Sequence, residues 1–280
     1  MSRAILVIGA AGKTGRAVTR ALERRGVPVR AAVRPGSASR PYAAELVSPV
    51  GLDLTTGLGL SDALVGVAGV YHLAPNVHPD EVAIARHVVE SACAAAVSTF
   101  VFHSVLHPHD RAMPHHLRKG RAEELIRAAL PGATVLRPAA YHQNLLGAAL
   151  GGRIVVPYSL DVPFTNVDLD DVAEVAARVL TEDGHEGRSY DLVGPERRSV
   201  RQLAAEASDV LGHEVVAERM PLSEWLAGQV AGLDADRRGA LLAMFETYDR
   251  DGFVDASGDL QELLGRPPAT WRDVLVRGTT

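Results

Sequence analysis

Three glycines near the start of the chain have the spacing of a phosphate-binding loop. Gly9, Gly12 and Gly15 follow the apolar run 4–8 and precede the helical pattern 16–25. In such a loop the glycines allow a sharp turn, close backbone approach to phosphates, and tight packing of the helix on the sheet. The helix then directs its first N–H groups at the anion. We predict a dinucleotide site here; the alternative is an ordinary strand-to-helix turn. The predicted contact residues are Gly9, Gly12, Lys13, Thr14 and Gly15.

An arginine follows the next apolar run, residues 29–33. NAD-preferring sites place Asp or Glu at this position to bind the ribose 2′-hydroxyl, whereas this chain has Arg34. A guanidinium forms forked, charge-assisted hydrogen bonds with a phosphate. Arg34, with Ser37, Ser39 and Arg40 just after it, therefore predicts NADP(H) in preference to NAD(H). The alternative is that Arg34 is a solvated strand end.

Polar residues also follow two further predicted strands. Asp53 and Leu54 come after the third strand, where we expect them to meet the adenine; alternatively Asp53 caps a turn. Ser104 ends the fifth strand, at the carboxyl edge where ligands bind in open α/β sheets. Ser104 could orient a substrate carbonyl there, or it could be a turn residue.

Strand and helix patterns alternate through the first half of the chain. This alternation predicts an α/β fold with right-handed crossovers and a doubly wound parallel sheet. The predicted strands are 4–8, 29–33, 45–47 with 50–52, 69–73, 99–103 and 134–137. The predicted helices are 16–25, 61–64, 79–95 and 114–130.

The pattern loosens after Gly151 and Gly152. We predict a nucleotide-binding domain at 1–152, with strands returning to it from 153–195, and a smaller α+β lobe at 153–280. A cleft between such lobes is the usual place for a substrate. The later predicted strands are 153–156, 163–166 and 189–193. The later predicted helices are 169–180, 200–211, 221–230, 235–248, 259–264 and 271–276.

Composition narrows the partners of the chain. It has 280 residues, a net charge of −5 and 47% hydrophobic residues, so a large core can form and no nucleic-acid partner is indicated. No apolar run is long enough to span a membrane, and we expect a cytoplasmic protein. The single cysteine, Cys93, is predicted to be a small core residue. Only Lys13 and Lys119 among the 29 basic residues are lysine, which supports a need for an amine at these positions.

Taken together, these segments resemble the NmrA-like branch of atypical short-chain dehydrogenases/reductases. The resemblance implies a Rossmann-type NAD(P)-binding domain, with Ala74 and Asn144 among the cofactor contacts and Tyr141 beside the nicotinamide. Similar proteins include quinone, phenylpropanoid and dye reductases, and also redox sensors without catalysis. The segments that carry the resemblance are 9–15, 29–34, 69–75, 100–105, 115–119, 136–146, 167–173 and 190–195.

One departure concerns the Tyr-x-x-x-Lys pattern of typical short-chain dehydrogenases. The matching positions here hold His115 and Lys119, so the lysine is present and the tyrosine is absent. The resemblance implies that Lys119 binds the ribose hydroxyls. Since the two residues share one helical face, His115 could donate or relay a proton near neutral pH; alternatively it is an exposed first-turn residue. Tyr141 is the second candidate acid, unless it is only a buried aromatic residue.

Five histidines crowd one stretch, but their spacing matches no common zinc-ligand pattern, and we predict no metal. They are His103, His107, His109, His115 and His116.

We therefore predict an NADPH-dependent oxidoreductase that reduces a small carbonyl- or quinone-like molecule. Two alternatives stay open: a non-catalytic NADP(H) sensor acting through a protein partner, and an isomerase or cyclase on the same scaffold. The expected partner is a small-molecule substrate, with no nucleic acid and no membrane; a homodimer or a regulatory protein partner is left open.

Overall fold

The computed structural model describes residues 4–36, 45–229 and 232–279, and it divides into two compact units. Two helices, α4 (Pro114–Ala129) and α6 (Leu169–Thr181), contribute residues to both units. The first unit comprises Met1–Pro108, Arg118–Arg137 and Val172–Tyr190. The second unit comprises His109–Leu117, Pro138–Asp171 and Asp191–Thr280.

A seven-stranded sheet forms the centre of the first unit, in the order β3-β2-β1-β4-β5-β6-β9. β1 pairs in parallel with both β2 and β4, so the strand order reverses on its two sides. Ligands of open α/β sheets bind at the carboxyl ends of the strands beside such a reversal. The predicted α/β fold with a doubly wound, Rossmann-type sheet is confirmed. The strands are β1 (Ala4–Val7), β2 (Val29–Val33), β3 (Val47–Gly51), β4 (Val67–His72), β5 (Thr99–His103), β6 (Thr134–Pro138) and β9 (Ser189–Leu192).

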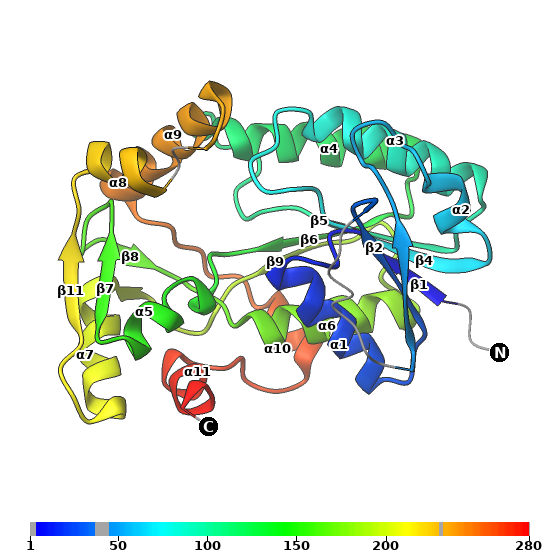
Figure 1. Ribbon diagram of the computed structural model, residues 1–280. Helices are drawn as coiled ribbons and strands as arrows, with labels where there is room; N and C mark the ends of the chain where they lie inside the picture. The colour runs from blue at the N-terminus through cyan, green and yellow to red at the C-terminus, as the bar shows by residue number, and fades with distance from the viewer. Residues whose placement is uncertain (1–3, 37–44, 230–231, 280) are drawn as a thin grey trace. The chain divides into compact units, whose positions relative to one another are not determined.

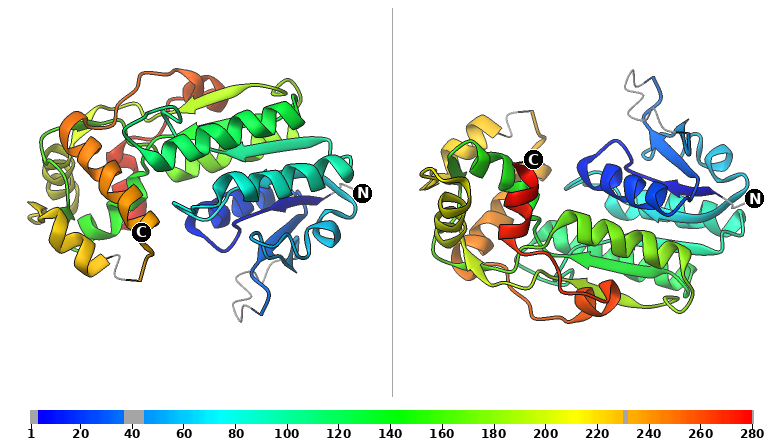
Figure 2. Two further views of the ribbon diagram at one scale, coloured as in Figure 1. Left: turned by 90° about the horizontal axis from the view of Figure 1, so that it is seen from above. Right: turned by 90° about the horizontal axis from the view of Figure 1, so that it is seen from below.

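Helices cover both faces of this sheet (Figures 1 and 2). α3 (Glu81–Ala94) and α4 lie on one face, whereas α1 (Lys13–Arg24) and α6 lie on the other. The short α2 (Leu60–Leu64) precedes β4. α1, α3 and α6 each turn a mostly apolar stripe to the sheet, which is why the sequence shows a helical period between strands. The buried side of α4 also includes Lys119 and Glu123.

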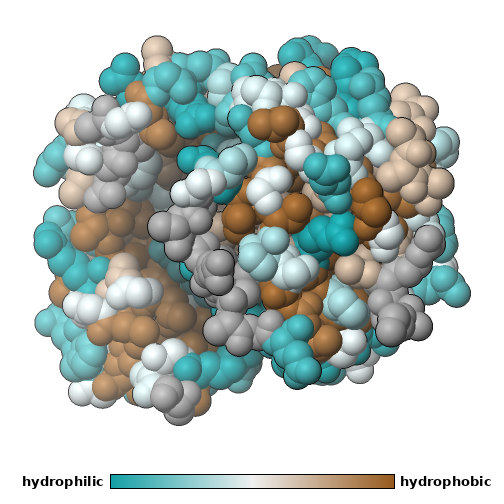
Figure 3. Space-filling view, turned by 45° about the vertical axis from the view of Figure 1, so that its right-hand side comes forward, coloured by the Kyte–Doolittle hydropathy of each residue, from teal (hydrophilic) through white to brown (hydrophobic). Residues whose placement is uncertain are grey.

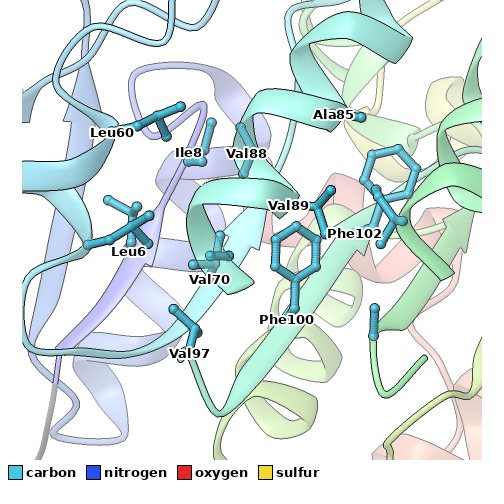
Figure 4. Close-up of a cluster of buried hydrophobic side chains, with 14 of the residues drawn as sticks. Leu6, Ile8, Leu60, Val70, Ala85, Val88, Val89, Val97, Phe100 and Phe102 are labelled. Carbon is cyan, nitrogen blue, oxygen red and sulfur yellow. The ribbon is translucent and has the colours of Figure 1, made fainter. Parts of the chain in front are cut away.

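The core of the first unit lies between β1, β4, β5 and α3 (Figure 4). Leu6, Val70 and Phe100 project from three neighbouring strands, and Val88 and Val89 of α3 pack over them. All five side chains are at most 2% exposed. Burying each such side chain stabilises the fold by about 1.5–3 kcal/mol, so this packing fixes where the strand ends lie.

The second unit combines helices with two small sheets. β7 pairs in parallel with β11, and β8 pairs antiparallel with β10. Trp271 is fully buried in its core, and its Nε1 donates to the Leu203 carbonyl at 2.9 Å. The strands are β7 (Arg153–Val156), β8 (Pro163–Phe164), β10 (Arg198–Ser199) and β11 (Val216–Arg219). The helices are η1 (His142–Asn144), α5 (Leu146–Leu150), α7 (Val200–Leu211), α8 (Leu222–Gln229), α9 (Ala235–Asp251), α10 (Asp259–Leu264) and α11 (Trp271–Gly278).

The prediction that Cys93 is a core residue is wrong. Cys93 is exposed on α3, because the buried stripe of that helix passes through Val88, Val89 and Ala92 instead. A residue one position past the stripe is turned by about 100° from its neighbour and faces outward here.

Large exposed apolar side chains are few in the part of the chain that the structure describes. Leu58 and Val65 are the most exposed, at 70% and 68%. On the face shown in Figure 3, hydrophobic residues gather in several areas that hydrophilic residues border. Single exposed apolar residues such as Leu58 and Val65 are usual for a protein surface. No described helix is long and apolar enough to cross a membrane.

Candidate active site

The glycine loop connects β1 to α1 with two backbone contacts that exclude any larger residue. Gly9 has a φ of +80°, and a Cβ there would lie 2.8 Å from the Leu73 carbonyl oxygen. A Cβ on Gly15 would lie 2.1 Å from the Gly9 carbonyl oxygen. A Cβ on Gly12 would meet nothing closer than 3.4 Å, so this position leaves room at the start of α1. These contacts match the three roles expected of such glycines.

Arg34 lies at a pocket that it shares with the glycine loop. The pocket is lined by Ala11, Gly12, Arg34, Pro35 and Gly36. The arginine is exposed, so its guanidinium can reach an anion in this pocket. A phosphate on the adenosine side of a dinucleotide fits that position and charge. Ser37, Ser39 and Arg40, which were predicted to assist, lie outside the described residues.

Three further residues that were predicted to contact the cofactor, Asp53, Leu54 and Ala74, follow β3 and β4. The Asp53 carboxylate accepts hydrogen bonds from the Thr55 and Thr56 N–H groups at 2.9 and 3.3 Å, which is the turn cap considered as the alternative. These bonds, the one from Thr55 foremost, lower the pKa of Asp53. Leu54 is partly buried against the core, and Ala74 is 5% exposed after β4.

Lys119 lies on α4 in a polar environment that the sequence analysis did not foresee. Its Nζ is 2.8 Å from Oε1 of Glu81 and donates to the His103 carbonyl oxygen at 3.1 Å. The ammonium also lies 5.1 Å from the centroid of the Phe102 ring, within the range of a cation–π contact. Lys119 is therefore anchored to the beginning of α3 and to the end of β5.

Two buried histidines lie at the ends of β4 and β5. Nδ1 of His103 is hydrogen-bonded to the Tyr71 hydroxyl. Burial, and after it the Lys119 charge, lowers the pKa of both His72 and His103 to about 3. Both imidazoles are therefore neutral at physiological pH, so neither is a source of protons there.

Ser104 belongs to a second buried network. Its hydroxyl donates to Glu123 Oε1 at 2.5 Å, and Glu123 is 2% exposed. The other oxygen of Glu123 pairs with Arg137 Nη2 at 2.6 Å. This chain of contacts ties the end of β5 to α4 and β6, so the Ser104 hydroxyl is already engaged as a donor.

The remaining predicted residues lie in the second unit. His115 is 7% exposed, so the alternative of an exposed first-turn residue is wrong. Its ring meets that of His116 edge-on at 5.7 Å, and His116 meets Phe253 at the same centroid distance. An aromatic cluster of this unit continues from Phe253 through Tyr248, at 5.1 Å.

Tyr141 directly precedes the 3-10 helix η1 that follows β6, and Asn144 is the last residue of η1. Tyr141 is partly buried and Asn144 is exposed. Gln143, in the middle of η1, fixes this short helix to Asp168: Gln143 Nε2 donates to the carboxylate at 2.5 Å. Arg277 pairs with the same carboxylate at 2.5 Å. Neither Gln143 nor Asp168 was singled out from the sequence.

The sequence analysis missed the most buried acids and bases of the first unit. Glu81 could have been found: it falls on the same stripe of α3 as Ile84, Ala85 and Val88, where an acidic residue is unexpected. Among the described residues, no group of three or more His, Cys, Asp or Glu side chains is placed to hold a metal ion.

Comparison with known proteins gives the same cofactor class. A curated relative, (4-alkanoyl-5-oxo-2,5-dihydrofuran-3-yl)methyl phosphate reductase from Streptomyces griseus, is 31% identical over 280 residues, which cover 96% of this chain and 95% of the relative. The crystal structure of an NADPH-dependent quinone oxidoreductase from Escherichia coli, complexed with NADPH, aligns with a TM-score of 0.83 and 25% identity over 99% of this chain and 100% of that one. Triphenylmethane reductase from Citrobacter sp., complexed with NADP(H), aligns with a TM-score of 0.81 and 25% identity over 98% and 99%.

The sequence profile of the NmrA-like family matches residues 1–265, nearly the whole chain and both compact units. This chain belongs to the NmrA-like family.

Proposed function

We propose that this chain is an NADPH-dependent oxidoreductase that reduces a small carbonyl- or quinone-like molecule. The observation that carries the proposal is the pocket in which Arg34 meets the glycine loop at Ala11 and Gly12. A cationic side chain beside a phosphate-binding loop suits the 2′-phosphate of NADPH and has no such partner in NADH. The relatives described above support the chemistry, because they are reductases and two were solved with NADPH or NADP(H).

Most of the residues that would hold the cofactor belong to the first unit. The loop from Gly9 to Gly15 would bind the pyrophosphate, and Arg34 would bind the 2′-phosphate. Asp53 and Leu54 would contact the adenine, Ala74 would be a further cofactor contact, and Lys119 would donate to the nicotinamide ribose. When bound, NADPH supplies a hydride to the substrate.

Reduction of a carbonyl then requires a proton at the substrate oxygen. His115 is the proposed donor, because it lies four residues before Lys119 on α4 and so shares a helical face with it. Tyr141 is the second candidate, with Asn144 as a neighbouring cofactor contact. Ser104 could accept a hydrogen bond from the hydroxyl formed on the substrate while its own O–H stays on Glu123; to orient a carbonyl as a donor it would have to release Glu123.

NADPH oxidation against a panel of quinones and aldehydes tests this function. We expect slow turnover with at least one member, and no comparable rate with NADH. Gly15→Val supplies the background rate, because its side chain would collide with the Gly9 carbonyl oxygen and disrupt the glycine loop. Tight NADP(H) binding without turnover on the whole panel, together with capture of a protein partner, would instead favour a sensor.

A further inference from the structure

A buried ion pair joins the first turn of α3 to α4. Glu81 is fully buried, Lys119 is 4% exposed, and Oε1 and Nζ lie 2.8 Å apart. Both residues belong to the first unit. An ammonium removed from water is costly unless an opposite charge and hydrogen-bond acceptors surround it. Glu81 provides the charge at this position.

The ion pair is one of two contacts that fix the ammonium. Lys119 Nζ also donates to the carbonyl oxygen of His103 at 3.1 Å. An ammonium has three N–H donors; the His103 carbonyl takes one of them and Glu81 lies within ion-pair distance, so donor capacity remains for a ligand. The lysine stem is long and flexible, and without such anchors the direction of the remaining donors would be undefined.

The carboxylate itself is held by its place on the helix. Glu81 is the first residue of α3, where the N-terminal end of the helix dipole stabilises negative charge. It also lies on the buried stripe of α3, one turn before Ile84 and Ala85. A buried ion pair gives little net stability compared with apolar residues of the same size. Its main physical effect is therefore to define where the ammonium lies.

We propose that Glu81 is a positioning residue that holds the Lys119 ammonium for the nicotinamide ribose hydroxyls of NADP(H). This inference rests on the proposed function, and specifically on the ribose contact of Lys119. Glu81 touches neither cofactor nor substrate in this arrangement; it acts through Lys119.

The test compares two ligands that differ in the nicotinamide ribose. NADP⁺ contains it, whereas adenosine 2′,5′-bisphosphate carries only the adenosine end with its phosphates. In Glu81→Gln we expect NADP⁺ to bind roughly tenfold more weakly, the scale of a lost charge-assisted contact, with adenosine 2′,5′-bisphosphate unchanged by calorimetry. The matched control is Glu90→Gln on the same helix, where Glu90 pairs with Arg86 at the surface; both ligands should bind it normally.

A double-mutant cycle separates positioning from general damage. In a Lys119→Ala background, Glu81→Gln should cause no further loss of NADP⁺ affinity. Equal weakening of both ligands, or unchanged NADP⁺ affinity in Glu81→Gln, would overturn the inference. If Glu81→Gln does not fold by thermal melting, Glu81→Asp keeps the charge but shortens its reach, and it should show the same ligand selectivity.

The proposed function fails in a different way. If the unmodified chain binds neither ligand, the NADP(H) site itself is wrong. If it binds both and Lys119→Ala keeps full NADP⁺ affinity, the site stands, but the ribose contact of Lys119 and with it the role of Glu81 are wrong.

Discussion

The imidazole of His72 stacks on the ring of Phe102, with centroids 5.5 Å apart and an interplanar angle of 29°. Neither ring nitrogen of His72 has a hydrogen-bond partner among the described residues. The histidine is fully buried, and this burial, followed by the Lys119 charge, lowers its pKa to about 3. At neutral pH the neutral ring of His72 therefore packs like an apolar side chain, and its protonation in the folded state is unfavourable.

Acid should destabilise the fold through this histidine. The folded pKa of His72 is depressed to about 3, so the unfolded chain, which titrates near 6.5, binds more protons between these values. Stability is therefore present above the unfolded pKa and is lost as the pH falls below it. From pH 7 to pH 5 we expect His72 alone to remove about 2 kcal/mol from the free energy of unfolding.

Urea unfolding of His72→Leu at the two pH values measures this contribution. The variant should lose about 2 kcal/mol less than the unmodified chain over the same interval. At pH 7 it should be similarly stable, because the replaced ring makes no hydrogen bond. The same loss in both proteins would show that His72 does not take part in the acid response.

Arg34 should determine the choice between the two nicotinamide cofactors. We expect NADPH to bind more tightly than NADH, and Arg34→Ala to remove most of the difference, since a forked charged contact corresponds to about tenfold to a hundredfold in affinity. Titration calorimetry with both cofactors measures it. Arg20→Ala, at an exposed position on α1, is the control and should keep the preference. Equal affinity of the unmodified chain for both cofactors would contradict the assignment.

The substitutions His115→Ala and Tyr141→Phe identify the proton donor. His115→Ala should lower turnover by roughly a hundredfold, the scale of a lost general acid, while NADPH affinity stays nearly unchanged. Lys119→Ala should weaken cofactor binding and turnover together. If His115→Ala is fully active and Tyr141→Phe is not, the donor is Tyr141. Full activity in both would mean that water or the substrate supplies the proton.

The close packing at Gly15 should affect the stability of the fold as well as cofactor binding. In Gly15→Ala the new Cβ would collide with the Gly9 carbonyl oxygen, so we expect a lower melting temperature and loss of NADP(H) binding. Gly239 is the matched control: it lies inside α9, and a Cβ there meets nothing within 4 Å. Gly239→Ala should stabilise the fold by about 0.5–1 kcal/mol. If Gly239→Ala lowered the melting temperature and Gly15→Ala left it unchanged, the packing argument for Gly15 would be wrong.

The parts of the site that could be predicted are local in the sequence. Gly9 and Arg34 come just after two strands, and Gly15 lies in the first turn of the next helix, so their positions depend on a turn and on strand direction alone. The alternating pattern that surrounds them also predicted the parallel sheet, because strands and helices differ in apolar period.

The parts that could not be predicted depend on packing between distant segments. Lys119 pairs with Glu81 of α3, and Ser104 donates to Glu123 of α4. The apolar period of a helix predicts which face is buried, but it does not predict which polar side chains meet on that face. β11 was missed for the same reason, since this strand of Val216–Arg219 is defined by pairing with β7.

The scarcity of lysine gives the chain a built-in pair of chemical reporters. Its two side-chain amines differ sharply in access: Lys13 is exposed in the glycine loop, whereas Lys119 is 4% exposed. Desolvation lowers the pKa of Lys13, which leaves more of its amine unprotonated and reactive. Of the two lysines, an amine-directed acylating reagent should therefore label Lys13 before Lys119, and labelling of Lys119 should report opening of the first unit. Ligand protection at each amine can then be followed separately by mass spectrometry, without any substitution in the chain.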